Sequence, residues 1–250
     1  MGLEVENPRF SWIIKGIEHN VLQKAWQIKI WNNNKEIIWD SKKTFSSEST
    51  NIEYRGKTLE SHQNYTWQVK IWDNKNHEST WSEKAVFCTA FLPDDSFSGS
   101  WIKNPDNKIR SPFFRKEFDI PGKIKSAVVY TSSIGLFEMH LNGKKVNDHF
   151  FEPNTTQFTE RLLYTTYDVS QQIKQGKNAI GLWLGEGQSA YSAPPEGRFT
   201  NNNMRVPVFD RPMALLQLHI VLENGNKIII VSNETWKTSS SPLTFNNYYG

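Results

Sequence analysis

The sequence predicts an all-β protein made of two β-sandwiches, the first immunoglobulin-like or fibronectin type III-like and the second jelly-roll-like. Many short runs are rich in Val, Ile, Tyr, Phe and Trp, several of these runs alternate apolar and polar residues, and turn-forming residues separate them. Hydrophobic residues make up 37% and aromatic residues 13% of the 250 residues, with ten Trp, which is enough for two cores.

The first module is expected over residues 1–95. Two of its segments alternate strictly, as a half-buried strand requires, because successive side chains of a strand point to opposite faces. Turn chemistry follows the longer one, at Asp73-Asn74-Lys75-Asn76. Five strands in this length are typical of an immunoglobulin-like sandwich. The predicted strands are 25–31, 36–39, 51–54, 65–72 and 84–89.

The second module is expected over residues 96–250, after a short polar segment that is rich in turn formers. Asn142-Gly143 follows an alternating run and predicts a tight type I′ hairpin, and Glu223-Asn224-Gly225-Asn226 predicts a second tight turn. Asp168 is expected to cap a short helical turn over 169–175, which Gly176 ends. Jelly-roll sandwiches have this spacing. The predicted strands are 125–131, 135–141, 163–168, 179–184, 214–222 and 227–231.

Charge and composition exclude several classes of protein. The net charge is +3 and the basic residues are scattered, so no nucleic-acid partner is expected. No run approaches the roughly 20 apolar residues of a membrane span, so no membrane partner is expected either. The N-terminus lacks the features of a signal peptide, which predicts a cytoplasmic protein; a chain trimmed from a longer one would instead be secreted or periplasmic. Cys88 is the single cysteine, and its apolar surroundings predict a buried, inert thiol.

An ordered series of short motifs resembles the N-terminal region of bacterial α-L-rhamnosidases, glycoside hydrolase family 78. The resemblance covers nearly all of the chain, and the number and order of the motifs carry it, since each motif alone is weak. The motifs are Asn7-Pro8-Arg9-Phe10-Ser11-Trp12, Trp39-Asp40-Ser41, Tyr65–Asp73, Pro112-Phe113-Phe114-Arg115-Lys116-Glu117-Phe118, Leu141-Asn142-Gly143, Tyr164–Ser170 and Leu184-Gly185 with Gly187.

The resemblance implies a non-catalytic portion of such an enzyme. In that family the hydrolytic carboxylates lie in a separate (α/α)₆ barrel, and the sequence shows no acidic cluster that could replace them: Asp94-Asp95 belongs to the linker, and Glu152 and Glu160 are expected on the surface. No catalytic residue is therefore predicted here. The expected partners are rhamnose-containing glycosides and the catalytic domain of the parent enzyme. The alternative is a free-standing carbohydrate-binding protein.

The resemblance also implies a sugar site in the second module, near a calcium-binding loop. Asp148 lies at the acidic position of that loop, with Asn147 or Asn154 as neighbours, and calcium prefers oxygen ligands. Asp148 is therefore a candidate calcium ligand and sugar-binding residue. The alternative is that its carboxylate caps the loop. The favoured interpretation is capping, because His149 stands where a second oxygen donor would be needed.

The segment 189–210 supplies two more candidates. Tyr191 either forms an aromatic platform for a sugar ring or packs on Pro194-Pro195. Arg198 either donates to sugar hydroxyls or lies in a solvated loop. A segment of this length without predicted structure is often functional. The predicted carbohydrate-binding residues are thus Asp148, Asn154, Tyr191 and Arg198.

Overall fold

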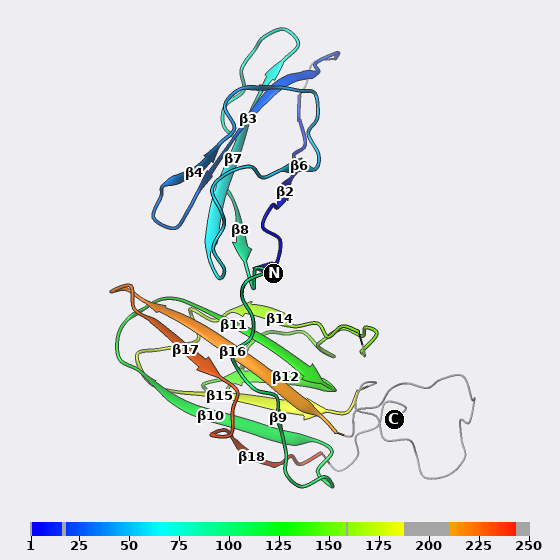
Figure 1. Cartoon of the computed structure of the whole chain (residues 1–250), viewed down its shortest axis with the longest axis vertical. Helices are drawn as coiled ribbons and strands as arrows, with labels where there is room; N and C mark the ends of the chain where they lie inside the picture. Colours follow the sequence, from blue (N-terminus) through cyan, green and yellow to red (C-terminus); the bar gives the residue numbers. More distant parts are fainter. Residues whose placement is uncertain (1, 17–18, 159, 188–210, 244–250) are drawn as a thin grey trace, which may run out of the picture. The chain divides into compact units, whose positions relative to one another are not determined.

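The computed structural model describes the chain apart from residues 1, 17–18, 159, 188–210 and 244–250. It consists of two compact units, residues 1–96 and 97–250 (Figure 1). Every regular element in the described residues is a β-strand, which confirms the predicted fold class. None of these residues forms a helix long and apolar enough to cross a membrane.

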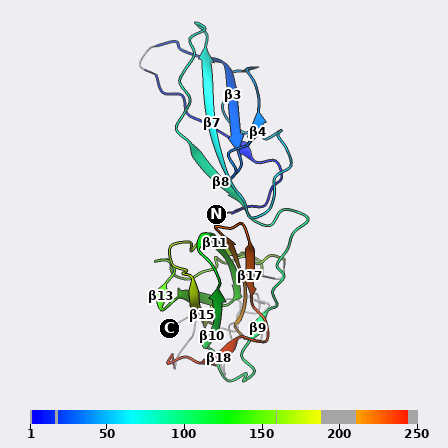
Figure 2. The same cartoon turned by 90° about the vertical axis from the view of Figure 1, so that its left-hand side faces the viewer.

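The first unit has one large and one small sheet. The large sheet has the order β1-β8-β7-β3-β4, with β5 also paired to β3, and the small sheet consists of β2 and β6. Figure 2 shows β3 and β7, the longest strands of this unit, side by side in the large sheet. The strands are β1 (Gly2–Leu3), β2 (Arg9–Phe10), β3 (Gln23–Trp31), β4 (Ile37–Asp40), β5 (Thr44–Phe45), β6 (Ile52–Glu53), β7 (Asn64–Asp73) and β8 (Ala85–Thr89).

The alternating pattern of β3 determines which of its side chains enter the core. Ile28 and Ile30 are fully buried between the sheets, whereas Gln27 and Lys29 are half-buried on the other face. At the start of β7 the hydroxyl of Tyr65 accepts a hydrogen bond from the N–H of Glu60, at 2.9 Å. This tyrosine corner is a hallmark of immunoglobulin-like domains.

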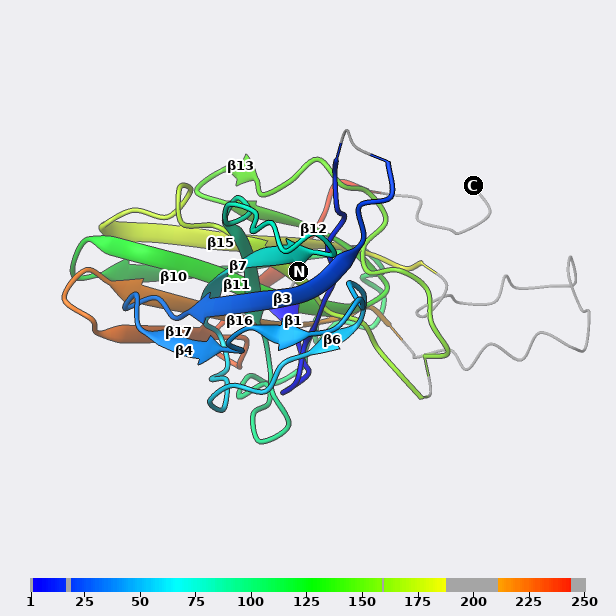
Figure 3. The same ribbon diagram turned by 90° about the horizontal axis from the view of Figure 1, so that it is seen from above.

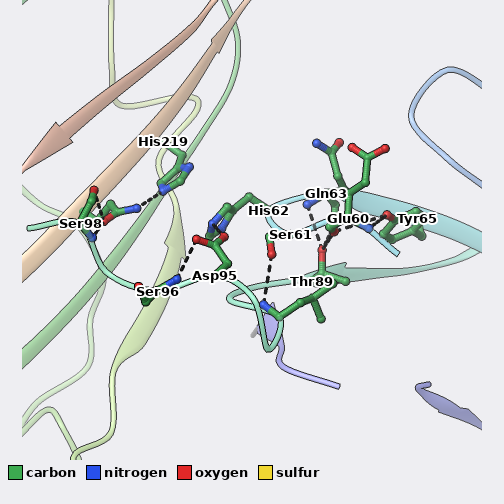
Figure 4. Close-up of polar contacts among 12 residues, drawn as sticks. Glu60, Ser61, His62, Gln63, Tyr65, Thr89, Asp95, Ser96, Ser98 and His219 are labelled. Atoms are coloured by element: carbon green, nitrogen blue, oxygen red, sulfur yellow. Dashed lines mark hydrogen bonds and ion pairs between the residues drawn. The ribbon is translucent and has the colours of Figure 1, made fainter. Parts of the chain in front are cut away.

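Hydrogen bonds between the loop before β7 and residues 89–95 hold the end of the first unit. The Thr89 hydroxyl donates to the carbonyl of Glu60 at 2.6 Å, and the Ser61 hydroxyl accepts from the N–H of Leu92 at 3.1 Å. His62 lies 2.8 Å from a carboxylate oxygen of Asp95 (Figure 4). These contacts fix the last residues of the unit against the loop that precedes β7.

The second unit is a sandwich of two sheets. One has the order β13-β12-β15-β10-β18, and the other has the order β14-β11-β16-β17, with β9 also paired to β16. The strands are β9 (Ile102–Lys103), β10 (Pro112–Ile120), β11 (Ile124–Ile134), β12 (Leu136–Leu141), β13 (Lys144–Lys145), β14 (Thr165–Asp168), β15 (Gly176–Gly185), β16 (Met213–Leu222), β17 (Lys227–Val231) and β18 (Lys237–Ser240).

Its core lies between the inner faces of these sheets. From the first sheet Leu182 and Leu184 point inward, and from the second Leu216 and Leu218 do the same, all at most 1% exposed. Fully burying a Leu side chain contributes roughly 1.5–3 kcal/mol, so such alternating rows are the main source of stability. The opposite row of β15, which includes Gly181 and Trp183, faces outward.

Both predicted hairpin turns of the second unit are confirmed. Asn142 and Gly143 have φ of 53° and 80°, as a type I′ turn requires, and they join β12 to β13. The turn at Gly225, with φ of 87°, joins β16 to β17, which run side by side in Figure 3.

Two local expectations need correction or refinement. Residues 169–175 form a hydrogen-bonded turn and not a helix: the N–H of Ile173 donates to the carbonyl of Val169 at 3.1 Å, and Asp168 caps the turn by accepting from Ser170 at 2.9 Å. Cys88 is half-buried, so the prediction of a buried thiol is wrong. Its strand β8 pairs at this position with β1 on one side and β7 on the other, which leaves the side chain on a partly open face.

Candidate functional site

The loop after β13 contains two of the predicted sugar-binding residues, Asp148 and Asn154. Both are exposed, and the Asp148 side chain is exposed completely. The described contact of Asp148 is a long one, 4.0 Å from its carboxylate to Nε2 of His149. Loop capping, which we expected of Asp148, is performed by Asn147, whose side-chain oxygen accepts from the N–H of His149 at 3.0 Å.

The carboxylate of Glu152 is the shared partner of the polar side chains in this loop. Its carboxylate accepts hydrogen bonds from the Tyr167 hydroxyl and, at 3.2 Å, from the side-chain amide of Asn147, and Nδ1 of His149 also lies 3.2 Å away. The carboxylate-bearing side chain is only 17% exposed, so the prediction that Glu152 is a surface residue is wrong. Burial, and then the hydrogen bond to Glu152, raises the pKa of Tyr167 above its ordinary value.

The same loop presents two aromatic side chains to solvent. Phe150 is 72% exposed and Phe151 is 77% exposed. The ammonium group of Lys145 lies 4.1 Å from the ring centroid of Phe150. Exposed aromatic residues on a loop with a fixed shape are typical of contact surfaces.

A calcium ion does not fit the described residues of this loop. Calcium takes six to eight oxygen ligands, but the oxygens of Asn147 and Glu152 are already occupied by hydrogen bonds, which leaves Asp148 as a single exposed carboxylate. Within the described part of the chain, no three His, Cys, Asp or Glu side chains form a group that could hold a metal ion.

The other two predicted residues, Tyr191 and Arg198, lie outside the described residues. Their proposed roles as a sugar platform and a hydroxyl donor therefore stay predictions.

A second candidate site is an open hollow of about 390 Å³ on the outer face of the sheet that contains β10, β12, β15 and β18. The register of the strands creates it: Phe113 of β10 is opposite Trp183 of β15, and Arg115 is opposite Gly181. The rings of Phe113 and Trp183 lie 5.1 Å apart at an angle of 54°. Because Gly181 has no side chain, the floor between the flanking residues is open. We call this feature the Gly181 hollow.

Polar groups surround the aromatic pair of the Gly181 hollow. His140 comes from β12 and lies opposite Gly181, and Lys237 comes from β18 and lies opposite Arg115. The indole N–H of Trp183 donates to the hydroxyl of Ser111 at 3.0 Å, which fixes the ring. The hollow thus combines aromatic surface with hydrogen-bond donors, the combination that small polar ligands require.

Two of the polar side chains that line the hollow lie close to acids on their own strands. Arg115 lies 2.6 Å from Glu117, and His140 lies 3.2 Å from Glu138, which also contacts Lys145 at 2.7 Å. None of the described lining residues is an Asp or a Glu. The arrangement can bind a polar ligand, but it does not supply the two carboxylic groups that glycoside hydrolysis requires.

The Gly181 hollow was not predicted from the sequence. The sequence does contain a signal for it. The alternation of 179–184 places Leu182 and Leu184 on the inward face of the predicted strand and Trp183 on the outward face. A large aromatic residue on that side is unusual and marks a candidate contact residue. The pairing of Trp183 with Phe113 could not be inferred, because it depends on a register between strands 70 residues apart in the sequence.

Comparisons with known proteins assign both units. Residues 122–250 match the model of the α-L-rhamnosidase N-terminal domain, and residues 1–93 match that of the Rha78A-like, N-terminal immunoglobulin domain. An α-L-rhamnosidase of Formosa agariphila is 30% identical over the whole chain. The chain spans only 29% of the length of that relative.

Solved structures agree with these matches. The α-L-rhamnosidase structure from Dictyoglumus thermophilum has a TM-score of 0.85 and 33% identity, and the match covers 99% of this chain and 29% of that one. The structure from Aspergillus terreus also has a TM-score of 0.85, at 28% identity, with 97% of this chain and 28% of that chain covered.

Proposed function

The chain belongs to the α-L-rhamnosidase N-terminal domain family, and from this premise we propose that it supports the catalytic domain of an α-L-rhamnosidase and binds rhamnose. The parent enzyme would hydrolyse terminal α-L-rhamnose from glycosides, and this region would not perform the chemistry. The lining of the Gly181 hollow, which lacks carboxylates, supports a binding role.

The observation that carries the sugar-binding proposal is the aromatic pair beside a glycine on an otherwise polar sheet face. Apolar faces of sugar rings, which consist of C–H groups, bury against aromatic rings, and Trp183 and Phe113 offer such surface. L-rhamnose adds a methyl group that suits an aromatic neighbour. Arg115, His140 and Lys237 are placed to contact the hydroxyls of a sugar on these rings.

Calorimetry with methyl α-L-rhamnoside tests this proposal. We expect a dissociation constant tighter than about 1 mM, or about −4 kcal/mol. Gly181→Val should abolish the heat of binding, because the valine side chain fills the hollow. A Cβ at this position meets only the carbonyl oxygen of Phe114, at 3.4 Å, so the strand should keep its structure. Ile229→Ala, which removes an exposed apolar side chain on the other sheet of the same unit, is the control.

Titrations of Asp148→Asn, and of the unaltered chain with added calcium, distinguish sugar binding in the Gly181 hollow from sugar binding in the loop of Asp148. Binding that survives Gly181→Val, but needs calcium and Asp148, would place the sugar in the loop and contradict the hollow. An absence of heat in the unaltered chain would remove the sugar-binding proposal altogether.

The support role is tested separately with the parent enzyme. We propose that Phe150 and Phe151 pack against the catalytic domain, because the loop holds these exposed rings in a fixed position through Glu152. Replacing both by Ala should lower the temperature at which the parent enzyme loses aryl rhamnoside hydrolysis, whereas the 250-residue chain alone should show no turnover. Unchanged thermal inactivation would exclude this contact, and turnover by the pure chain would overturn the division of labour.

A further inference from the structure

A crevice of about 650 Å³ opens in the first unit, where the small sheet meets β3, β4 and β5. The small sheet has two strands of two residues each, too short to cover the inner face of the large sheet. Trp26 of β3 and Trp39 of β4 therefore form an aromatic floor at the margin of the core, 7% and 9% exposed. We call this feature the Trp26 crevice. Its volume lies within the range of small-molecule sites, about 300–1,000 Å³.

Trp26 has an unsatisfied hydrogen-bond donor. Its indole N–H is buried and has no acceptor among the described residues. Two other indole N–H groups of the same unit have acceptors: Trp12 donates to Gln23 at 2.9 Å, and Trp72 donates to Glu78 at 3.0 Å. Buried donors without acceptors are rare and costly, so a donor of this kind in the lining of a crevice points to an acceptor supplied by a ligand.

The wall and the rim of the crevice are polar and held in place. Thr44 and Ser46 line the wall, and the segment after them is fixed by Gln23, whose amide donates to the carbonyls of Ser46 and Glu48 at 3.1 and 2.8 Å. The rim has Glu48 and Arg9 as exposed charged side chains. A rim of fixed geometry loses little freedom when it binds a ligand.

The charges on the rim balance. Arg9 and Arg55 oppose Glu48 and Glu53, and Arg55 lies 4.0 Å from Glu53. An anion would face two carboxylates and a cation would face two guanidinium groups. A neutral ligand with several hydroxyl groups can accept from the arginines and donate to the glutamates without repulsion.

We propose that the Trp26 crevice binds a neutral saccharide unit, with one of its oxygens accepting the indole N–H of Trp26. The sugar ring lies against Trp39, and its hydroxyls contact Glu48 and Arg9 at the rim. This site belongs to the immunoglobulin-like unit and does not depend on the Gly181 hollow of the second unit.

The test is an NMR titration of the ¹⁵N-labelled 250-residue chain with the methyl glycosides of L-rhamnose, D-glucose, D-galactose and D-xylose. Trp26→Phe assigns the indole signal of Trp26. We expect this signal to shift saturably with at least one glycoside. Glu48→Ala should weaken that binding about tenfold, since it removes a hydrogen bond to a charged group at an exposed position. Glu83→Ala, another exposed glutamate of the same unit, is the matched control and should have no effect.

Gly181→Val distinguishes this proposal from the one for the second unit. The Trp26 signal should respond in that variant as in the unaltered chain, even if the hollow no longer binds. Two results would overturn the proposal: no shift of the signal with any glycoside up to about 10 mM, tenfold above a dissociation constant of about 1 mM, or an undiminished response in Glu48→Ala. The first result would mean that the crevice holds only water.

Discussion

Replacing Glu152 by Ala should destabilise the second unit by about 2–4 kcal/mol. The Tyr167 hydroxyl and the Asn147 amide each lose a hydrogen bond to a charged group, worth about 1.5–3 kcal/mol. Both partners are half-buried, so water replaces part of this loss. The contact with His149, an exposed residue, adds little. Glu152→Gln keeps an acceptor for Tyr167 and should cost less, about 1 kcal/mol.

Urea unfolding followed through isoleucine methyl signals measures this loss. The chain has two units, so one signal from each is needed: Ile28 reports the first unit and Ile180 the second, and both are buried. Glu160→Ala is the control, because sequence analysis placed Glu152 and Glu160 together on the surface, whereas the structure leaves only Glu160 there.

An Ile180 transition of Glu152→Ala within about 0.5 kcal/mol of that of the unaltered chain, the usual range for surface substitutions, would contradict a stabilising role of this network. An equal shift of the Ile28 transition would also contradict it, because the loss would then not be local to the unit that contains the loop. A change in Glu160→Ala as large as that in Glu152→Ala would show that carboxylate removal in general, and not this network, is responsible.

Other predictions follow from single positions. Burial, and then the charge of Tyr65, raises the pKa of Tyr54 to about 12, so the folded state favours the neutral phenol. The resulting stabilisation is complete below about pH 10, the pKa of the unfolded chain, and falls by about 2–3 kcal/mol as the pH rises to 12. Tyr54→Phe should reduce this decline in alkaline denaturation. Gly143→Ala should cost about 1–2 kcal/mol, because only its φ of 80° is unfavourable and no atom lies near the new Cβ. Gly135→Ala should cost at least twice as much in the same unfolding assay, because its Cβ would lie 2.2 Å from the carbonyl oxygen of Gly185. No group of His, Cys, Asp or Glu side chains within the described residues could hold a metal ion, so a chelator should change the melting temperature by less than about 1 °C; a large decrease would show that the chain binds a metal ion.

Local patterns were sufficient to predict strands whose two faces differ. The run that became β3 alternates without interruption, so its inward residues were identified correctly from sequence. The strand β10 was not predicted, although its sequence was noted as a motif. Its inward row is Phe114, Lys116, Phe118 and Ile120, and the lysine within this row interrupts the period-2 signal. The structure accommodates that lysine by a hydrogen bond to the hydroxyl of Thr235 at 2.6 Å, a partner 119 residues away.

The candidate sites, like β10, depend on contacts between segments far apart in the sequence, which local patterns do not reveal. The loop around Asp148 was singled out from the sequence because the family resemblance implies a calcium-binding loop there. The role of Glu152 in anchoring this loop was not predicted, since the decisive partner, Tyr167, comes from β14. The Trp26 crevice was also missed, because it exists only where the small sheet ends short of the large one. Each of these features is a property of the packing of distant segments and not of any one segment.

The Gly181 hollow is difficult to explain as a feature that serves stability alone. Glycine in the middle of a strand is unfavourable by roughly 0.5–1 kcal/mol relative to Ala, and at this position an added Cβ would make only an ordinary contact at 3.4 Å. A β-branched residue there would stabilise the strand and cover Trp183 and Phe113. The chain instead has the residue that leaves both rings accessible. An open aromatic pair beside a glycine that the fold does not require is what a surface shaped by binding would retain.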